Sequence, residues 1–119
     1  MKLWIDDVRP APEGYLWVKT VDEAIEKLIT FQKEYDQRWK LYVLGYWDRE
    51  DLEKGLNWWR IEEVSCDNDL GVDFVEGYKL LEWLEATGRN YPIRIHSANP
   101  VARERMRAII ERNGWTEVK

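Results

Sequence analysis

Three polar clusters each follow a short apolar run, and this pattern constrains the fold more than any other feature of the sequence. The clusters are Asp6-Asp7, Cys66-Asp67-Asn68-Asp69 and His96-Ser97-Ala98-Asn99. Short apolar runs bounded by polar and turn-forming residues are typical of buried strands. If these strands lie parallel in one sheet, their carboxyl ends meet at one edge, which is where open α/β sheets bind ligands. We therefore expect the three clusters to lie close together.

Strand and helix signals alternate along the chain. We expect strands at 1–5, 41–44, 61–66 and 92–95, an extended segment at 15–19 and an edge strand at 115–118. We expect helices from 21 to the mid 30s, over 77–85 and from 100 to 113, with a short irregular helix over 49–60. The first helix begins with a capping box formed by Thr20 and Glu23. This alternation predicts a mostly parallel sheet of four or five strands, covered by helices on both faces through right-handed crossovers.

Length and composition limit the classes of protein to which the chain can belong. With 119 residues we expect a single domain over 1–119, in which a Trp-rich section at about 35–60 is the atypical part. The net charge of -5 argues against sequence-independent binding to duplex DNA, which needs Lys and Arg to neutralise phosphates. No apolar stretch approaches the roughly 20 residues of a membrane span. The lone Cys66 and the absence of a signal-peptide pattern lead us to expect a cytoplasmic location.

The acidic clusters predict a metal site. Asp6, Asp7 and Asp69, joined by Asp67, would gather at the ends of two adjacent strands, where their carboxylates repel one another. A divalent cation that prefers oxygen ligands relieves this repulsion, and Mg²⁺, or Mn²⁺ in its place, fits best. Each cluster alone is better explained as a helix cap or a turn, because Asp and Asn favour such positions. The two clusters together, after neighbouring strands, favour the metal site.

The motifs resemble those of a known family. The stretch from Asp69 to Gly77 has the spacing between the phosphate-accepting aspartate of response-regulator receiver domains and their downstream acidic-Gly pair. Asp6-Asp7 matches the paired metal-binding acids of receivers, and Ser97-Ala98 matches the Ser/Thr-Ala after their fourth strand.

More specifically, three motifs in order are similar to those of the cyclic-phosphate-processing receiver family. They are Asp6-Asp7-Val8-Arg9-Pro10, Asp67-Asn68-Asp69-Leu70-Gly71 and His96-Ser97-Ala98-Asn99-Pro100. The resemblance implies a flavodoxin-like, receiver-type three-layer α/β/α sandwich and chemistry on cyclic phosphate ends of RNA or on nucleotides. The family usually has His where this chain has Asn68, and the only candidate for the lysine that receivers place after their fifth strand is Lys119.

Roles can be assigned to the remaining polar residues of the clusters. Asp69 is a candidate nucleophile as well as a metal ligand, and Ser97, Arg9 and Asn99 are candidate phosphate contacts, although Arg9 could cap its loop and Asn99 a turn. His96 is the only histidine and a candidate acid for the leaving oxygen, but strand alternation could point it away from the cluster.

Trp39, Trp47, Trp58 and Trp59 crowd one section of the chain. They are read in three ways: as core, as a surface for self-association or a protein partner, and as a platform that stacks nucleobases.

Three functions follow from these features. The leading one is metal-dependent processing of a phosphate ester, with a cyclic phosphate on RNA or a nucleotide as the substrate. The alternatives are a non-catalytic partner-binding module and a signalling receiver phosphorylated on Asp69.

Overall fold

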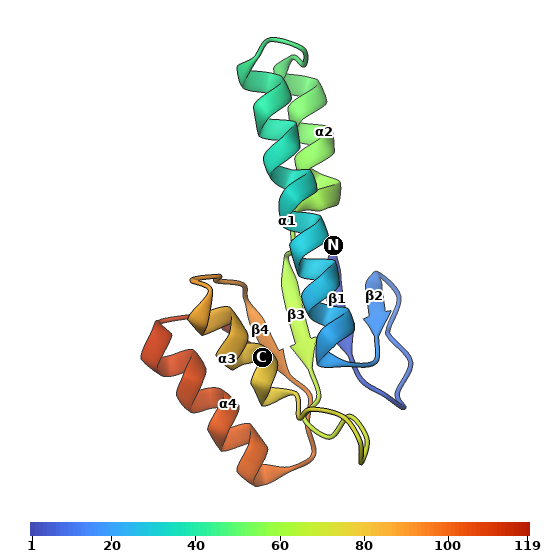
Figure 1. The fold of residues 1–119 in the computed structure, drawn as a ribbon, viewed down its shortest axis with the longest axis vertical. Helices are drawn as coiled ribbons and strands as arrows, with labels where there is room; N and C mark the ends of the chain where they lie inside the picture. Colours follow the sequence, from blue (N-terminus) through green and yellow to red (C-terminus); the bar gives the residue numbers. More distant parts are fainter.

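A computed structural model describes all residues from 1 to 119 and shows five parallel strands in the order β2-β1-β3-β4-β5 (Figure 1). The strands are β1 Lys2–Ile5, β2 Tyr15–Val18, β3 Glu63–Cys66, β4 Ile93–Ile95 and β5 Glu117–Val118. The helices are α1 Val21–Val43, α2 Arg49–Trp59, α3 Tyr78–Ala86 and α4 Pro100–Asn113. The parallel sheet and this strand order confirm the expected flavodoxin-like, receiver-type α/β fold. None of the four helices combines the length and the apolar composition that a membrane span needs.

One predicted strand is wrong. Leu41–Val43 form the last turn of α1 and Leu44 caps that helix, so the strand expected at 41–44 does not exist. The segment at 15–19, expected only to be extended, supplies β2 instead. A short apolar run cannot by itself be assigned to a strand or to a helix. Here residues 41–43 are helical because α1 continues beyond the mid 30s and packs along α2.

The helices α1 and α2 form a hairpin that projects beyond the sheet from the amino ends of the strands (Figure 1). Within it the Arg38 guanidinium lies 5.8 Å from the ring centre of Trp47 and 5.2 Å from that of Trp59. Gly55 allows this approach, because a Cβ there would lie 2.7 Å from Arg38 Cγ. Trp47 and Trp59 therefore hold the hairpin together, whereas Trp39 and Trp58 are 41% and 60% exposed.

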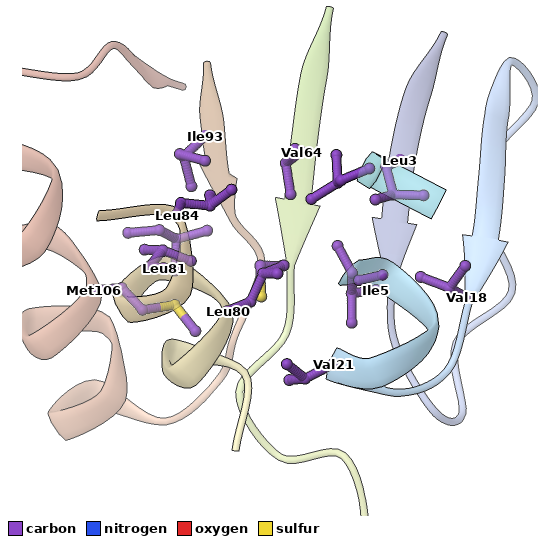
Figure 2. Close-up of a cluster of buried hydrophobic side chains, with 14 of the residues drawn as sticks. Leu3, Ile5, Val18, Val21, Val64, Leu80, Leu81, Leu84, Ile93 and Met106 are labelled. Carbon is purple, nitrogen blue, oxygen red and sulfur yellow. The ribbon is translucent and has the colours of Figure 1, made fainter. Parts of the chain in front are cut away.

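All the helices that pack on the sheet cover the same face. The chain crosses from β2 to β3, β4 and β5 in one direction, and right-handed crossovers then place α1, α3 and α4 on one side. Figure 2 shows the resulting core, in which Leu3, Ile5 and Val64 of the strands meet Leu80 and Leu84 of α3. The link from β1 to β2 crosses in the opposite direction, but it is a loop without a helix. The expected second layer of helices is therefore missing.

Side chains cover part of the other face of the sheet in place of helices. Trp4, Ser65 and Arg94 are register partners on three adjacent strands and point away from the helices. The Trp4 ring stacks on His96 with a centroid distance of 3.8 Å. The Glu63 carboxylate accepts hydrogen bonds from the Tyr15 hydroxyl and from Arg94, whose Nε lies at 3.1 Å. These contacts explain how Glu63 and Ser65 are buried without a helix above them.

The Glu63 cluster predicts a pH-dependent contribution to stability. Burial raises the pKa of Glu63, but the Arg94 and Tyr15 hydrogen bonds, with charge from Arg94 and Lys2, hold that pKa below its ordinary value. The contribution is thus fully present above the unfolded pKa of about 4.3 and is lost as pH falls through the folded pKa. We expect Glu63→Gln to lower the free energy of unfolding by about 2 kcal/mol at pH 7. In urea denaturation this difference should shrink below about pH 4, and a difference that is constant with pH would contradict the assignment.

Candidate functional site

Three carboxylates meet at the carboxyl edge of the sheet, from Asp6, Asp7 and Asp67. One ligand atom of each lies within 4.8 Å of the others. Asp6 and Asp7 directly follow β1 and Asp67 directly follows β3, and these neighbouring strands pair Ile5 with Cys66. The Asp67 amide donates to the Ile5 carbonyl at 2.9 Å, which extends this pairing into the acidic segments. The predicted gathering of the first two clusters is therefore observed.

Asp69 is the predicted member that the structure leaves outside this group. Because β3 ends at Cys66, Asp67 is the first residue past the strand and Asp69 lies two residues further on, exposed. Asp69 borders a surface pocket of about 420 Å³ together with Gly71 and Phe74. The geometry favours Asp67 over Asp69 as the carboxylate that completes the cluster, and the catalytic role of Asp69 stays a prediction.

Asp6 is nearly inaccessible to solvent and has both carboxylate oxygens engaged. Oδ1 accepts hydrogen bonds from the Val8 and Arg9 amides, both at 2.9 Å. Oδ2 accepts from Arg9 Nε at 3.0 Å and lies 3.2 Å from His96 Nε2. Burial raises the pKa of Asp6, but the backbone donors and the Arg9 charge outweigh it, so the pKa is lowered. Asp6 is an ionised carboxylate whose acceptor positions are already filled.

Asp67 is in the opposite electrostatic situation. Burial raises its pKa, and the charge of Asp6 adds to this effect, while the Asn68 amide, which donates to Oδ1 at 2.8 Å, opposes it. The net direction is upward. Burial is thus the main reason that ionised Asp67 is disfavoured, with a smaller contribution from the Asp6 charge, and a bound cation would favour the ionised form.

His96 faces the cluster, which strand alternation had left open. Its Nδ1 lies 2.8 Å from Ser65 Oγ and its Nε2 lies 3.2 Å from Asp6 Oδ2. Because an ionised carboxylate only accepts, we assign the proton to Nε2, so that Nδ1 accepts from the Ser65 hydroxyl. Burial lowers the pKa of His96 to about 4 despite the nearby Asp6 charge. The ring is thus neutral near pH 7, where it orients Asp6, and its predicted role as an acid stays untested.

The third cluster lies at the end of β4 and is held by its own turn. Ser97 Oγ accepts from the Asn99 amide at 3.1 Å, and Asn99 Oδ1 accepts from the amides of Val101 and Ala102, so that Asn99 caps α4. Arg103 Nη1 donates to the Ser97 carbonyl at 3.0 Å. The capping role of Asn99 is thereby observed, whereas phosphate contacts by Ser97 and Asn99 stay predictions.

The first missed contribution comes from two tryptophans beneath the acidic loop. Trp17 Nε1 donates to the Asp6 carbonyl at 2.7 Å, and Trp4 Nε1 donates to the Arg9 carbonyl at 2.9 Å. Trp4 and Trp17 are register partners on β1 and β2. These two hydrogen bonds fix the backbone of the loop that carries Asp6 and Arg9. Strand alternation could have placed both rings on one face, but only a correct β2 would have shown that they are neighbours.

Asn68 is the second residue whose role sequence reasoning missed. It is fully buried, and its Nδ2 donates to Glu76 Oε2 at 2.9 Å while its Oδ1 accepts from the Tyr78 amide at 3.2 Å. The Gly77 amide also donates to the Asn68 carbonyl at 2.8 Å. Asn68 therefore fastens both ends of the 69–76 loop beside the acidic cluster, and in this chain it is a structural residue.

Comparison with known proteins agrees with this geometry. A family model described as "Cyclic-phosphate processing Receiver domain" matches residues 1–112. The chain belongs to this family. The match runs through the Trp-rich section at 35–60, which the sequence motifs alone did not cover. No curated protein and no solved structure matches the chain.

The donor set of this cyclic-phosphate processing receiver domain fits a hard divalent cation. Three carboxylates supply only oxygen atoms, the ligands that hard divalent cations prefer, and one ligand atom of each lies within 4.8 Å of the others. Asp7 and Asp67 have the freer oxygens, whereas Asp6 reaches a metal only by giving up one of its present donors. The cluster could thus bind a metal, and its composition does not choose between Mg²⁺ and Mn²⁺.

A substitution at Gly77 would measure how tightly the 69–76 loop packs against the acidic segment. A Cβ at this position would lie 1.9 Å from the Asp67 carbonyl oxygen, so the backbone of the acidic segment would have to move. We expect Gly77→Ala to cost about 3 kcal/mol or more in urea denaturation. The matched control is Gly88→Ala, where φ is +69° and nothing lies within 4 Å of the added carbon, with an expected cost of about 1 kcal/mol. Equal costs for the two variants would contradict the close packing at Gly77.

Proposed function

We propose that this receiver domain carries out metal-dependent processing of a phosphate ester, with a cyclic phosphate on RNA or a nucleotide as the substrate. The observation that carries the proposal is the carboxylate cluster of Asp6, Asp7 and Asp67 at the carboxyl edge of the sheet, in a chain of the cyclic-phosphate processing receiver family. Ligands of open α/β sheets bind at this edge.

The polar residues around the cluster supply the binding functions that such a reaction needs. Bound Mg²⁺ or Mn²⁺ would polarise a phosphoryl oxygen and lower the pKa of a coordinated water. Asp7 and Asp67 would hold the ion, and the neutral His96 ring would keep Asp6 in place from behind. Ser97 lies at the end of β4 next to this edge, where its hydroxyl would contact a phosphate oxygen.

The proposed reaction is hydrolysis of one ester bond in the cyclic phosphate. The oxygen of water bonds to phosphorus, one ring P–O bond breaks, and the leaving oxygen takes up a proton while the attacking water releases one. The product is a phosphate monoester. Asp69 remains a candidate base that takes the proton from the attacking water, or the nucleophile of a two-step route in which its carboxylate opens the ring and water then cleaves the phosphoryl-aspartate. Asp67 is the alternative because it directly follows β3.

A partner-binding module is the second candidate, because the helical hairpin exposes large apolar side chains. Trp39 is 41% exposed and Trp58 60%, and Val43, Leu44 and Tyr46 at the turn of the hairpin are also exposed. Aromatic residues exposed in this way are frequent at protein interfaces. Only Trp39 and Trp58 of the four clustered tryptophans support this reading, because Trp47 and Trp59 pack inside the hairpin.

A pair of conservative substitutions tests the metal site and identifies its carboxylates. We expect Asp67→Asn to weaken Mg²⁺ binding about tenfold or more, measured by calorimetry, and to abolish turnover of a nucleoside 2′,3′-cyclic phosphate followed by phosphorus NMR. Asp69→Asn, which changes an exposed carboxylate outside the cluster, should leave Mg²⁺ affinity nearly unchanged.

The opposite outcome, with metal binding lost in Asp69→Asn and kept in Asp67→Asn, would restore Asp69 as the ligand. Mg²⁺ binding without conversion of any cyclic phosphate would contradict the enzymatic proposal and favour the partner-binding module.

A further inference from the structure

Arg9 is the only cation that forms ion pairs with the acidic cluster. Its Nε lies 3.0 Å from Asp6 Oδ2 and its Nη2 lies 3.7 Å from Asp67 Oδ2. The same Nη2 donates to the His96 carbonyl at 2.9 Å. The guanidinium thus bridges the ends of β1, β3 and β4, where it partly neutralises the carboxylates of Asp6 and Asp67.

A metal ion and Arg9 would compete for the same oxygens. Asp6 Oδ2 already takes two donors, so a metal bond at this atom has to displace Arg9 or His96. Asp67 Oδ2 is the oxygen that the Asn68 amide leaves free, and it is the one that faces Arg9. A divalent cation and a guanidinium about 5 Å apart also repel each other by several kcal/mol at an effective dielectric constant of about 20. His96 is buried and stacked on Trp4, so Arg9 is the group that is able to leave.

The Arg9 side chain is half-exposed and suited to a second ligand. Its side chain is 53% exposed, so solvent replaces the lost contacts at little cost. The loop backbone does not need to follow, because the Arg9 amide stays bonded to Asp6 Oδ1 and the Arg9 carbonyl to the Trp4 indole. A guanidinium at the rim of a metal site presents a planar fork that fits two phosphate oxygens.

We propose that Arg9 is exchanged between two ligands: it is the counter-ion of Asp6 and Asp67 when no metal is bound, and it binds a phosphoryl oxygen when a metal takes its place. This inference rests on the proposed function for the identity of the second ligand. Metal and phosphate then bind cooperatively, because the metal releases Arg9 and the phosphate holds it in its new position. Arg9 lowers the affinity for the metal alone and raises the affinity for metal and phosphate together.

The test measures Mg²⁺ affinity with and without inorganic phosphate in the full chain. Intrinsic tryptophan fluorescence reports binding through Trp4 and Trp17, whose indoles donate to the Arg9 and Asp6 carbonyls, and calorimetry measures the affinity independently of the chain's other tryptophans. We compare the parent with Arg9→Gln. Arg49→Gln is the control, because Arg49 is 81% exposed at the start of α2 and pairs only with Glu53.

We expect Arg9→Gln to raise the affinity for Mg²⁺ alone and to lower the affinity for Mg²⁺ and phosphate together. Arg9→Gln should bind Mg²⁺ alone about three- to fivefold more tightly and should lose a coupling of about fivefold or more between Mg²⁺ and phosphate. Arg49→Gln should keep the parent values. A merely structural role for Arg9 would weaken both affinities together. Arg9→Lys, which keeps the charge without the fork, is the second variant and should retain the weak Mg²⁺ binding but lose most of the coupling.

Three outcomes overturn the inference. Unchanged or weaker Mg²⁺ binding in Arg9→Gln shows that Arg9 does not compete with the metal, and preserved coupling shows that it does not bind the phosphate. Failure of the parent to bind Mg²⁺ overturns both this inference and the proposed function. If the coupling is present and no cyclic phosphate is converted, only the enzymatic function fails and the exchange of Arg9 stands.

Discussion

The pairing of β1 with β3 is the constraint on which the rest of the site depends. It places Asp6 and Asp7 beside Asp67. Three carboxylates at such short distances repel one another strongly when they are partly buried. Asp6 is stabilised by two amides, Arg9 and His96, whereas burial and the charge of Asp6 raise the pKa of Asp67. The protein therefore balances one carboxylate fully and leaves charge that a cation can bind.

Side chains that cover the helix-free face of the sheet also support the acidic cluster at its carboxyl edge. Helices cover one face only, and on the other face aromatic and polar side chains pack on one another. Trp4 illustrates the consequence, because its ring stacks on His96 while its indole nitrogen donates to the loop that carries Asp6 and Arg9. The same layer of side chains thus covers the sheet and positions the site. The first part of α1 covers the sheet, whereas its later part and α2 project beyond the amino ends of the strands, away from this edge (Figure 1).

The sequence predicted those features that depend on local pattern. Alternation gave the parallel sheet, and turn and cap signals located α3 and α4 and the polar ends of β1, β3 and β4. Prediction from the sequence failed where tertiary packing determines the structure. Leu41–Leu44 reads equally well as a strand or a helix, and only contact with α2 makes it the end of α1. Asp67 and Asp69 differ by two positions, and the exact end of β3 at Cys66 decides which one joins Asp6 and Asp7. The bond from Arg9 to the His96 carbonyl joins residues far apart in the chain, and the Asn68 side-chain bonds depend on how the 69–76 loop closes, so a local sequence pattern predicts neither.

Binding of Mn²⁺ followed by amide NMR tests the central claim most directly, because this paramagnetic ion broadens only the signals of nuclei close to it. The structure predicts that substoichiometric Mn²⁺ broadens the amide signals of Asp7, Val8, Asp67 and Asn68, which surround the cluster, and that excess Mg²⁺ restores them. Signals of Arg49–Trp59 in the hairpin should stay sharp, because this segment lies at the opposite end of the strands. Broadening centred on the acidic side chains of α2, or no broadening at millimolar Mn²⁺, would contradict a metal site formed by the ends of β1 and β3.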